Sequence, residues 1–339
     1  PQVIASLAAH FGLDMSTTYL KLNTLFSERL GFQFVFDTSF SRDMALIEQE
    51  KEFTQRLQAN DSLPLLASSC PGFVVYAEKR SHFVLPHISK VKSPQQIMGS
   101  LVKHFLVQQA RAQGNEAPAP KEILHVTLMP CYDKKLEASR KEFYHAEEES
   151  RDVDLVLTSI ELLDLFDRIS LDFPTLAETP IKPYLNNWHA NTSRLLSVTG
   201  GGSGGYLDYL YRKLAAKHNI EVSPEPLPLK KLRNTDFKEI SLVIRDDQGQ
   251  PKEIKFAMAY GLRNIDNITR QIKSGKCAYH YIEVMACPSG CLNGGGQIRS
   301  KPPQTVKEKL ISVEEKYNND QKLHEPESNT GVAEIYDLW

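Results

Sequence analysis

The sequence between residues 283 and 297 reads EVMACPSGCLNGGGQ. It includes the end of the apolar run His280 to Met285, which predicts a buried strand that delivers Cys287 to the edge of a sheet. Cys291 lies in the same loop, and the glycines behind it let the backbone approach a bulky inorganic group and direct N–H donors at it. The stretch therefore predicts two metal-binding thiolates beside a strand.

Two further cysteines follow apolar runs in the same way. Leu63 to Ala67 precedes Cys70, and Ile123 to Leu128 precedes Cys131. Proline stands beside Cys70, Cys131 and Cys287, where it rigidifies the loop and removes a competing backbone donor. Four thiolates gathered at one point bind a soft metal centre, and an iron–sulfur cluster is the leading candidate.

Two simpler explanations stay open on the residues alone. A single buried cysteine often serves only as a small hydrophobic side chain. Zinc is the rival metal, but structural zinc usually takes paired Cys-x2-Cys or cysteine–histidine motifs. No such pair occurs in this sequence, and its histidines show no metal-ligand spacing.

Composition excludes several classes of protein. The 339 residues carry a formal charge of −2, so there is no electrostatic case for binding nucleic acid or an anionic membrane. No apolar run approaches the roughly 20 residues that span a bilayer. Five scattered cysteines argue against a secreted disulfide framework and for a reducing compartment. The chain begins with Pro1 rather than methionine, so we expect that upstream sequence is missing.

Strands alternate with helices in the first half of the chain. This order predicts an α/β fold of two lobes, with mostly parallel sheets flanked by helices and ligands beyond the carboxyl ends of the strands. The expected strands are residues 32–36, 63–67, 123–128 and 153–158. The expected helices are a segment that Asp14 or Ser16 caps and Gly31 ends, and residues 41–57, 94–109 and 161–169.

The second half of the chain predicts the other lobe. A glycine-rich turn at residues 200–205 opens a helix at 206–218, strands 238–244 and 253–259 pair across a turn, and a helix at 264–274 precedes the last strand. The predicted domains are a first lobe at 1–175, a second lobe with the cluster-binding loop at 176–300, and a polar C-terminal tail or helix at 301–339.

The three cysteine contexts resemble the cluster-binding signatures of iron-only hydrogenases and of their non-hydrogenase eukaryotic relatives. The third signature matches from Glu283 to Gln297, residues 93–96 match a segment that lines the active-site cavity, and the second signature matches at Met129, Pro130, Cys131, Lys134 and Glu137. The resemblance covers essentially the whole chain. It implies that Cys70, Cys131, Cys287 and Cys291 ligate one [4Fe–4S] cluster between two α/β lobes. The family's second [4Fe–4S] cluster is expected in the missing N-terminal region.

Departures from the signatures indicate a branch of this family. Active hydrogenases have a proton-relaying cysteine where this chain has Ser69, and a hydroxyl is a poor proton shuttle. Ile298 replaces a proline after the third signature. Residues 34–38, 131–137 and 259–264 are typical of the cytosolic iron–sulfur assembly factors, the prelamin A recognition factor-like branch.

The resemblance implies a non-enzymatic [4Fe–4S] protein without catalytic residues. It would link an upstream scaffold to the cytosolic cluster-targeting complex and deliver clusters to apoproteins, with no nucleic-acid or membrane partner. Its expected location is the cytoplasm, with the nucleus left open as a second location. The alternatives are an iron-only hydrogenase and a nuclear binding protein of the prelamin A recognition factor type.

Several positions carry simpler expectations. Cys277 matches no ligand position and is expected to be a buried thiol. Without a diiron centre, Lys134 would pair with a carboxylate or offset the charge of the cluster. The glycines at 200–205 are expected to pack tightly near the cluster rather than to bind phosphate. Trp339 resembles a terminal docking residue, but packing on an internal helix is the favoured role.

Overall fold

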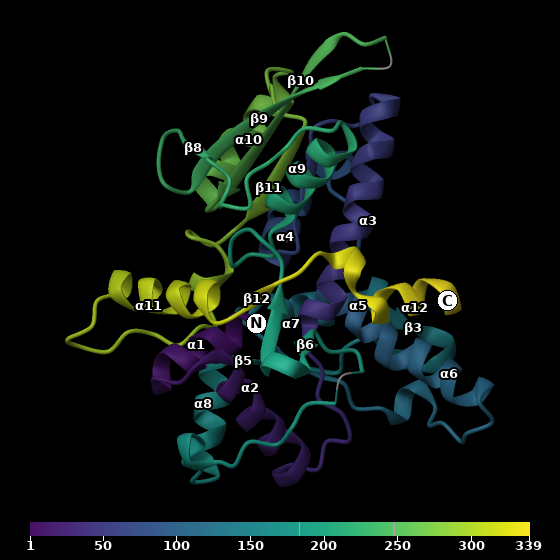
Figure 1. The fold of residues 1–339 in the computed structure, drawn as a ribbon, viewed down its shortest axis with the longest axis vertical. Helices are drawn as coiled ribbons and strands as arrows, with labels where there is room; N and C mark the ends of the chain where they lie inside the picture. Colours follow the sequence, from purple (N-terminus) through teal and green to yellow (C-terminus); the bar gives the residue numbers. More distant parts are fainter. Residues whose placement is uncertain (183, 247) are drawn as a thin grey trace. The chain divides into compact units, whose positions relative to one another are not determined.

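The structure is a computed structural model that describes residues 1–182, 184–246 and 248–339 (Figure 1). The chain folds into two compact units. Unit 1 consists of Pro1–Met44, Lys92–Ser197 and Leu292–Trp339, and unit 2 consists of Ala45–Val91 and Val198–Cys291. Both units are discontinuous, whereas the sequence predicts continuous lobes. The domain ranges 1–175, 176–300 and 301–339 stay a prediction.

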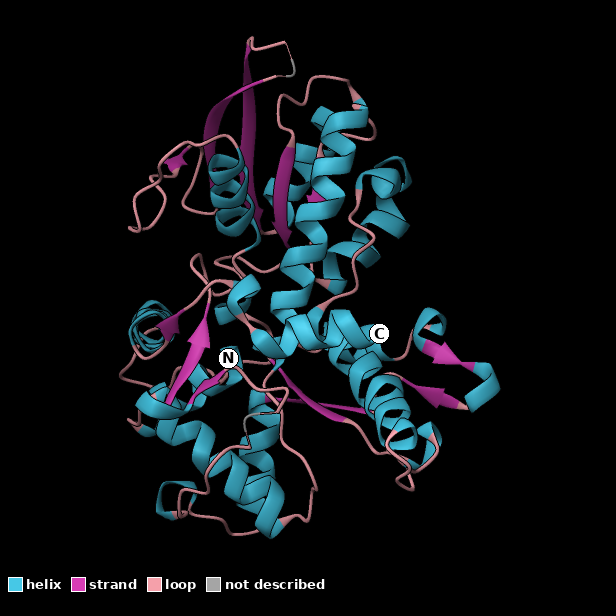
Figure 2. Ribbon diagram, turned by 45° about the vertical axis from the view of Figure 1, so that its right-hand side comes forward, coloured by secondary structure: helices cyan, strands magenta, loops and turns pink. Residues whose placement is uncertain are grey.

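Unit 2 is built on a mixed sheet. Within the described residues its strand order is β1 (Leu65–Ala67), β11 (Tyr281–Met285), β10 (Pro251–Tyr260), β9 (Phe237–Arg245) and β8 (Lys230–Lys231). The first three strands are parallel to one another, and β9 and β8 are antiparallel to their neighbours. Figure 2 shows β9 and β10 as a long ribbon of two strands.

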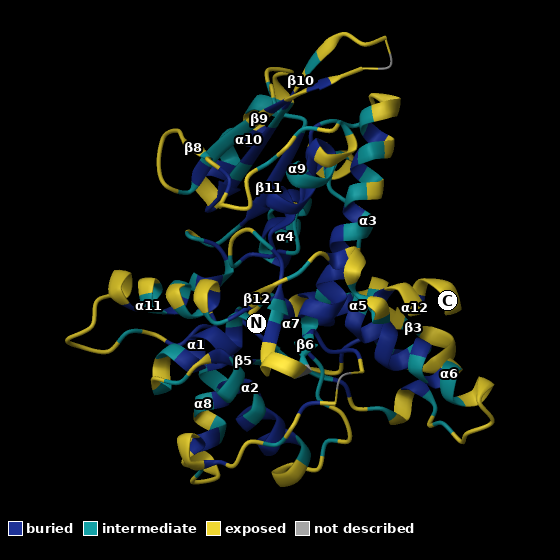
Figure 3. Ribbon diagram, viewed as in Figure 1, coloured by how far each residue is buried: buried dark blue, intermediate teal, exposed yellow. Residues whose placement is uncertain are grey.

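Strand β11 is an interior strand of this sheet and lies between β1 and β10. All of its residues are buried, and the strand is dark blue in Figure 3. A parallel strand reads as a continuous apolar run when both of its faces are covered. Helices pack against this sheet; they are α4 (Pro71–Arg80), α9 (Tyr206–Lys217) and α10 (Leu262–Lys273). The 3-10 helix η2 (His82–His87) follows α4, and the long helix α3 (Thr38–Ala59) contributes residues to both units.

Unit 1 contains more helices and only short strands. Its helices are α1 (Gln2–Phe11), α2 (Met15–Asn23), the π-helix η1 (Thr24–Arg29), α5 (Pro94–Ser100), the π-helix η3 (Leu101–Phe105), α6 (Leu106–Ala112), α7 (Asp133–Ala138), α8 (Ser159–Arg168), α11 (Val306–Asn319) and α12 (Thr330–Leu338). Its strands are β2 (Val126–Met129), β3 (Tyr144–His145), β4 (Ser150–Arg151), β5 (Leu155–Thr158), β6 (Trp188–His189), β7 (Arg194–Ser197) and β12 (Lys322–Leu323).

The strands of unit 1 pair in small groups. Strands β2 and β5 are parallel, with Met129 opposite Thr158, and β12 is parallel to β7. The pairs β6–β7 and β3–β4 are antiparallel. Parallel strands connected through helices in both units make the chain an α/β protein.

Several helices of unit 1 begin where a polar side chain satisfies the first free backbone donors. Thr158 and Glu161 form a capping box at the start of α8, and Thr305 and Glu308 form another at the start of α11. Of the two caps that the sequence offers for α2, Asp14 is the one used, because its carboxylate accepts from the amide of Thr17.

Most predicted elements are confirmed to within a few residues at their ends, but the strand expected at residues 32–36 is wrong. Helices α1, α4 and α11 were not predicted. The segment expected as a polar tail or helix carries α11 and α12, and Val313 and Tyr317 of α11 belong to the hydrophobic core that α1 and α2 share. The ring of Trp339 lies 5.7 Å from that of Phe105, yet the residue is 56% exposed.

Candidate functional site

Two of the predicted ligand loops meet at one edge of the sheet in unit 2. Strands β1 and β11 are parallel neighbours, with Ala67 opposite Glu283. Cys70 follows the end of β1 and Cys287 follows the end of β11. The carboxyl ends of parallel strands meet at the same edge of a sheet, so the two loops leave it side by side.

Backbone and hydroxyl donors hold the Cys70 loop against the loop after β11. The hydroxyl of Ser68 donates to the carbonyl of Val284 at 2.6 Å, and the amide of Cys70 donates to that hydroxyl at 3.2 Å. The amide of Ala286 donates to Cys70 Sγ at 3.4 Å. An N–H···S bond of this kind stabilises negative charge on sulfur.

Cys70 is also the N-cap residue of α4, with Pro71 at the first helical position. The side chain is 8% exposed, so this sulfur is screened from bulk water. The free amides and the positive end of the dipole at a helix N-terminus interact favourably with a negatively charged group. The amide of Ala286 and the N-terminus of α4 therefore both favour a negative charge on this sulfur.

Cys287 and Cys291 are joined by a tight turn. The amide of Gly290 donates to the carbonyl of Cys287 at 3.1 Å, and the amide of Ser289 donates to Asp236 at 3.0 Å. Gly290 has a φ of 76°, and a Cβ at this position would collide with the hydroxyl of Ser203. Glycine is therefore needed here for both conformation and space.

The glycine-rich loop before α9 packs against Cys291. The amide of Cys291 donates to Ser203 Oγ at 3.0 Å, and Cys291 Sγ lies 4.0 Å from the sulfur of Met285. The sequence expected tight packing of the segment 200–205, and this part of the expectation is confirmed. The side chain of Ser203 therefore holds Cys291 in place by accepting a hydrogen bond from its backbone amide.

A buried carboxyl group lies under the same loops. Glu283 is 1% exposed; it accepts from the hydroxyl of Tyr260 at 2.5 Å and from the amide of Leu207 at 2.8 Å. Burial raises the pKa of Glu283. Burial, and then the neighbouring Glu283, raises the pKa of Tyr260 well above its usual value. The pair connects β10, β11 and α9 beneath the cysteines.

Cys131 belongs to unit 1 and follows the end of β2. The amide of Gly296 donates to the carbonyl of Pro130 at 2.9 Å. A Cβ on Gly296 would lie 2.7 Å from the side chain of Thr158 and 3.2 Å from Cα of Cys131. The last glycine of the triple therefore packs directly on the Cys131 loop, where a larger residue would not fit.

Lys134 pairs with a carboxylate, as one of the two sequence expectations proposed. Its Nζ lies 2.9 Å from Glu137 Oε2, and both side chains are 9% exposed. Glu137 also accepts from Ser93 at 2.6 Å and from Gln95 at 3.2 Å. The second signature and the segment 93–96 therefore form one buried polar network in unit 1.

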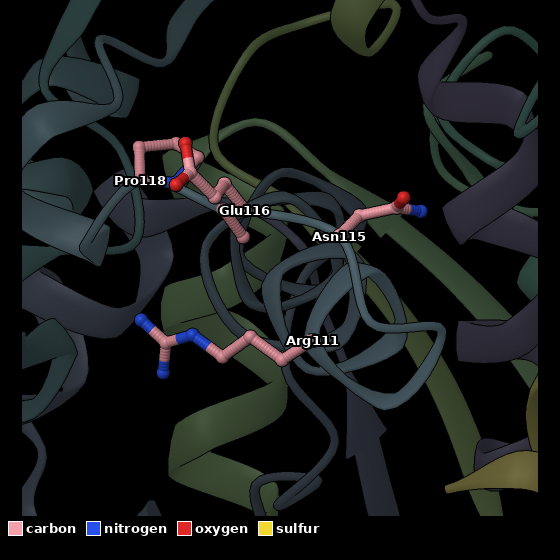
Figure 4. A pocket seen from close by; sticks show the side chains of 5 residues that line it. Arg111, Asn115, Glu116 and Pro118 are labelled. Carbon is pink, nitrogen blue, oxygen red and sulfur yellow. The ribbon is translucent and has the colours of Figure 1, made fainter.

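The structure brings Cys70, Cys287 and Cys291 into neighbouring loops of unit 2 and places Cys131 at a strand end of unit 1. Cys277 lies after α10, outside these loops, and burial raises the pKa of its thiol. The open pocket of Figure 4 is a different feature. It is lined by Arg111, Asn115, Glu116, Ala117 and Pro118, from α6 and the loop that follows it, and contains no predicted site residue.

Sequence reasoning missed the residues that hold the loops in place. Ser68 adjoins the first signature, so its position offered a signal. Ser203 and Asp236 are distant in sequence from the turn between Cys287 and Cys291 that they support. Their roles depend on tertiary contacts, which no local pattern encodes.

Comparisons with known proteins agree with this architecture. Residues 1–295 match the family described as iron only hydrogenase large subunit, C-terminal domain. The chain is 46% identical to "Cytosolic Fe-S cluster assembly factor narfl" of Danio rerio, over the whole chain and 80% of the relative. It is 46% identical to "Cytosolic iron-sulfur assembly component 3" of Mus musculus, over 69% of that protein, and 41% identical to "Protein NAR1" of Arabidopsis thaliana, over 73%.

The fold of this chain is also similar to those of solved structures. A single-residue variant of the [FeFe]-hydrogenase HydA1 from Chlamydomonas reinhardtii superposes with a TM-score of 0.79 at 27% identity, covering the whole chain and 88% of the hydrogenase. Among the described residues, no helix is long and apolar enough to cross a membrane. The chain therefore belongs to the iron-only hydrogenase-like family and, within it, to the branch of the cytosolic iron–sulfur assembly factors.

Proposed function

We propose that this protein is a non-enzymatic iron–sulfur protein of cytosolic cluster assembly. In this proposal Cys70, Cys131, Cys287 and Cys291 ligate one [4Fe–4S] cluster. The coarser part of the proposal, a role in cytosolic iron–sulfur assembly, is supported by the names of the relatives. The site residues and the cluster type are supported by the arrangement of the cysteine loops.

The observation that carries the proposal is the convergence of the Cys70 loop and the Cys287–Cys291 turn at one edge of the sheet in unit 2, with a backbone donor on Cys70 Sγ. The amide of Ala286 donates to Cys70 Sγ, and a tight turn through Gly290 joins Cys287 to Cys291. A single zinc ion would need sulfurs about 4 Å apart, since its bonds to sulfur are about 2.3 Å long. Among the described residues of unit 2 these three cysteines do not form so tight a group, which argues against a single zinc ion held by all three.

Cys131 would supply the fourth thiolate. Cys291 and Leu292 are consecutive residues, and only Asn293, Gly294 and Gly295 separate Leu292 from Gly296. Gly296 in turn donates its amide to the carbonyl of Pro130, beside Cys131. A short covalent tether therefore links the Cys287–Cys291 turn to the Cys131 loop.

Two features argue against hydrogen turnover. Ser69 stands where hydrogenases carry the proton-relaying cysteine, and a serine hydroxyl is a poor proton shuttle at neutral pH. The ammonium of Lys134 is already bonded to both oxygens of Glu137. We therefore propose that the cluster is carried, and that its ligands are the working residues.

We further propose that the protein works in the cytosol, between an upstream scaffold and the cluster-targeting complex. The relatives' names place them in cytosolic assembly, and the individual partners are our inference. A second [4Fe–4S] cluster upstream of residue 1 is part of the same proposal.

The cofactor is tested by measuring iron and acid-labile sulfide in protein purified without oxygen. Cys287→Ala should lose most of both, because removing one ligand exposes and destabilises the cluster. Cys277→Ala is the matched control and should retain the full content. Equal losses in the two variants, or zinc in place of iron and sulfide, would refute the assignment.

The role is tested by incubating the iron-labelled protein with an apo-acceptor that needs a [4Fe–4S] cluster, together with a cytosolic targeting complex. Labelled iron should appear in the acceptor, and the same protein should evolve no hydrogen from a reduced electron donor. Sustained hydrogen evolution would show that the protein is a hydrogenase.

A further inference from the structure

A second group of metal-binding side chains lies in unit 1, apart from any cysteine. His104 belongs to η3, His145 belongs to β3, and Asp152 directly follows β4. One donor atom from each of the three lies within 4.8 Å of the other two. His145 Nε2 is 3.0 Å from Asp152 Oδ1, and His104 Nε2 is 3.6 Å from the same oxygen.

The carboxylate of Asp152 is fixed and fully buried. Its Oδ2 accepts from Lys92 Nζ at 3.0 Å and from Ser100 Oγ at 3.4 Å, so Oδ1 is the oxygen that faces the two imidazoles. A Cβ on Gly99 would press against the Asp152 backbone, which shows how closely α5 holds this residue. A carboxylate held by one oxygen presents the other in a defined direction.

The imidazole of His104 is oriented by a carboxylate on its outer side. Its Nδ1 lies 3.1 Å from Glu148 Oε2, so Nε2 turns inward toward Asp152. Within the described residues this buried Nε2 has no hydrogen-bond partner. A histidine held at one nitrogen by a carboxylate, with the other nitrogen buried and without a hydrogen bond, is the usual arrangement of a metal ligand.

We propose that His104 Nε2, His145 Nε2 and Asp152 Oδ1 form a binding site for a divalent first-row transition metal ion such as Zn²⁺. Tetrahedral bonds of about 2.0–2.2 Å place ligand atoms about 3.3 Å apart, between the two distances found here. His145 is 35% exposed, which leaves room for water as the fourth ligand. The two imidazole rings meet edge to face at 4.4 Å, so small rotations bring both nitrogens onto one ion.

The chemistry of this site differs from that of the cysteine loops. Two imidazoles and a carboxylate suit zinc, iron(II), cobalt or nickel, and they do not hold an iron–sulfur cluster in the way thiolates do. No local sequence motif predicts the site, because its ligands at positions 104, 145 and 152 lie 41 and 7 residues apart. The short β3–β4 hairpin brings His145 and Asp152 together.

Cobalt(II) is the probe, because its absorption reports the ligand type. The full chain, purified without oxygen, is titrated with Co²⁺ and its visible ligand-field bands are followed. One equivalent should bind without thiolate-to-cobalt charge transfer in the near ultraviolet. His145→Gln should weaken this binding by more than about tenfold, whereas His82→Gln, an exposed histidine outside the group, should leave it unchanged. No thiolate-free binding by the wild type, or equal binding by His145→Gln, would overturn the proposal.

A second variant guards against misfolding. Glu148 touches the outer nitrogen of His104 and is itself 41% exposed, so Glu148→Gln should fold normally by circular dichroism. It should weaken Co²⁺ binding by about tenfold, because it removes the charge that orients and strengthens a ligand. Unchanged affinity in this folded variant would show that His104 does not bind the ion. Iron content should stay at the wild-type level in all of these variants.

Discussion

At Gly290, backbone conformation and packing both exclude a side chain. Its φ of 76° is left-handed, and its missing Cβ leaves the space that Ser203 Oγ occupies next to Cys291. Gly295 belongs to the triple-glycine stretch, yet nothing lies within 4 Å of the Cβ position there. Packing and backbone conformation therefore require glycine at Gly290 but not at Gly295, and this difference can be tested.

Gly290→Ala should lower both iron content and stability. The strain of the left-handed region and the overpacking against Ser203 add up to at least about 2 kcal/mol. Gly295→Ala is the control and should match the wild type in urea unfolding and in bound iron. If the two variants behave alike, Gly290 does not shape the cysteine turn.

The buried carboxyl of Glu283 should make stability depend on pH. Its folded pKa is raised above the ordinary value of 4.5 by burial. As pH rises above 4.5, the unfolded chain releases this proton while the folded chain keeps it, so stability falls until the folded pKa is passed. The side chain of Glu283→Gln does not titrate, so the stability of this variant relative to the wild type should increase as pH rises.

Urea unfolding of both proteins between about pH 5 and pH 8 measures this effect, since the midpoint follows stability at constant slope. Across this range the free energy of unfolding of the wild type should fall relative to that of Glu283→Gln. The fall should be about 1.4 kcal/mol for each pH unit between the unfolded and the folded pKa of Glu283. A difference that does not change with pH would contradict a raised pKa for Glu283.

At the scale of elements, residues 32–36 were predicted as a strand but form none. A local apolar pattern does not show whether a neighbouring strand is available. A strand needs a neighbour for its backbone groups. Here the side chain of Asn186 takes that role, because it donates to the carbonyl of Val35 and accepts from the amide of Asp37. Phe34 and Phe36 stack on each other, and Phe34 is exposed to solvent rather than packed in the core. By contrast, β11 was predictable, since it is buried throughout and apolar except for Glu283.

The sequence does not predict helix α11, because its apolar residues are few and lie among many charged ones. Val313 and Tyr317 are 3% exposed and lie on one face of the helix, while Ile311 is 43% exposed. Val313→Ala should lower the free energy of unfolding by about 2 kcal/mol through lost burial and a cavity. Ile311→Ala on the same helix should change it by less than about 0.5 kcal/mol. Chemical denaturation compares them, and equal effects would mean that α11 does not pack as described.

At the scale of the whole molecule, the sequence predicts the α/β class and the positions of the cysteines at strand ends. It does not predict the division into units. Helix α1 packs against α11 from the other end of the chain, and His324 bonds to Asp43 at 2.7 Å. Contacts of this range depend on tertiary folding, so no local pattern in the sequence gives units that are built from separate segments.

A cluster bound through four distant cysteines should also stabilise the whole fold. Removing iron with a chelator should lower Tm by several degrees, because binding free energy is lost from the folded state only. Cys287→Ala serves as the control, since it should already have the lower Tm and should not respond to the chelator. A wild-type Tm that is unaffected by chelation would mean that the cluster does not support the fold.

The most direct measurement of the central claim is the iron and acid-labile sulfide content of Cys131→Ala beside Cys287→Ala, with Mössbauer spectra of the wild type. Cys131 comes from unit 1 and Cys287 from unit 2. If one cluster uses both thiolates, the wild type should show a [4Fe–4S] spectrum and the two variants should lose iron to the same extent. Full iron content in Cys131→Ala would show that the four cysteines do not share a cluster.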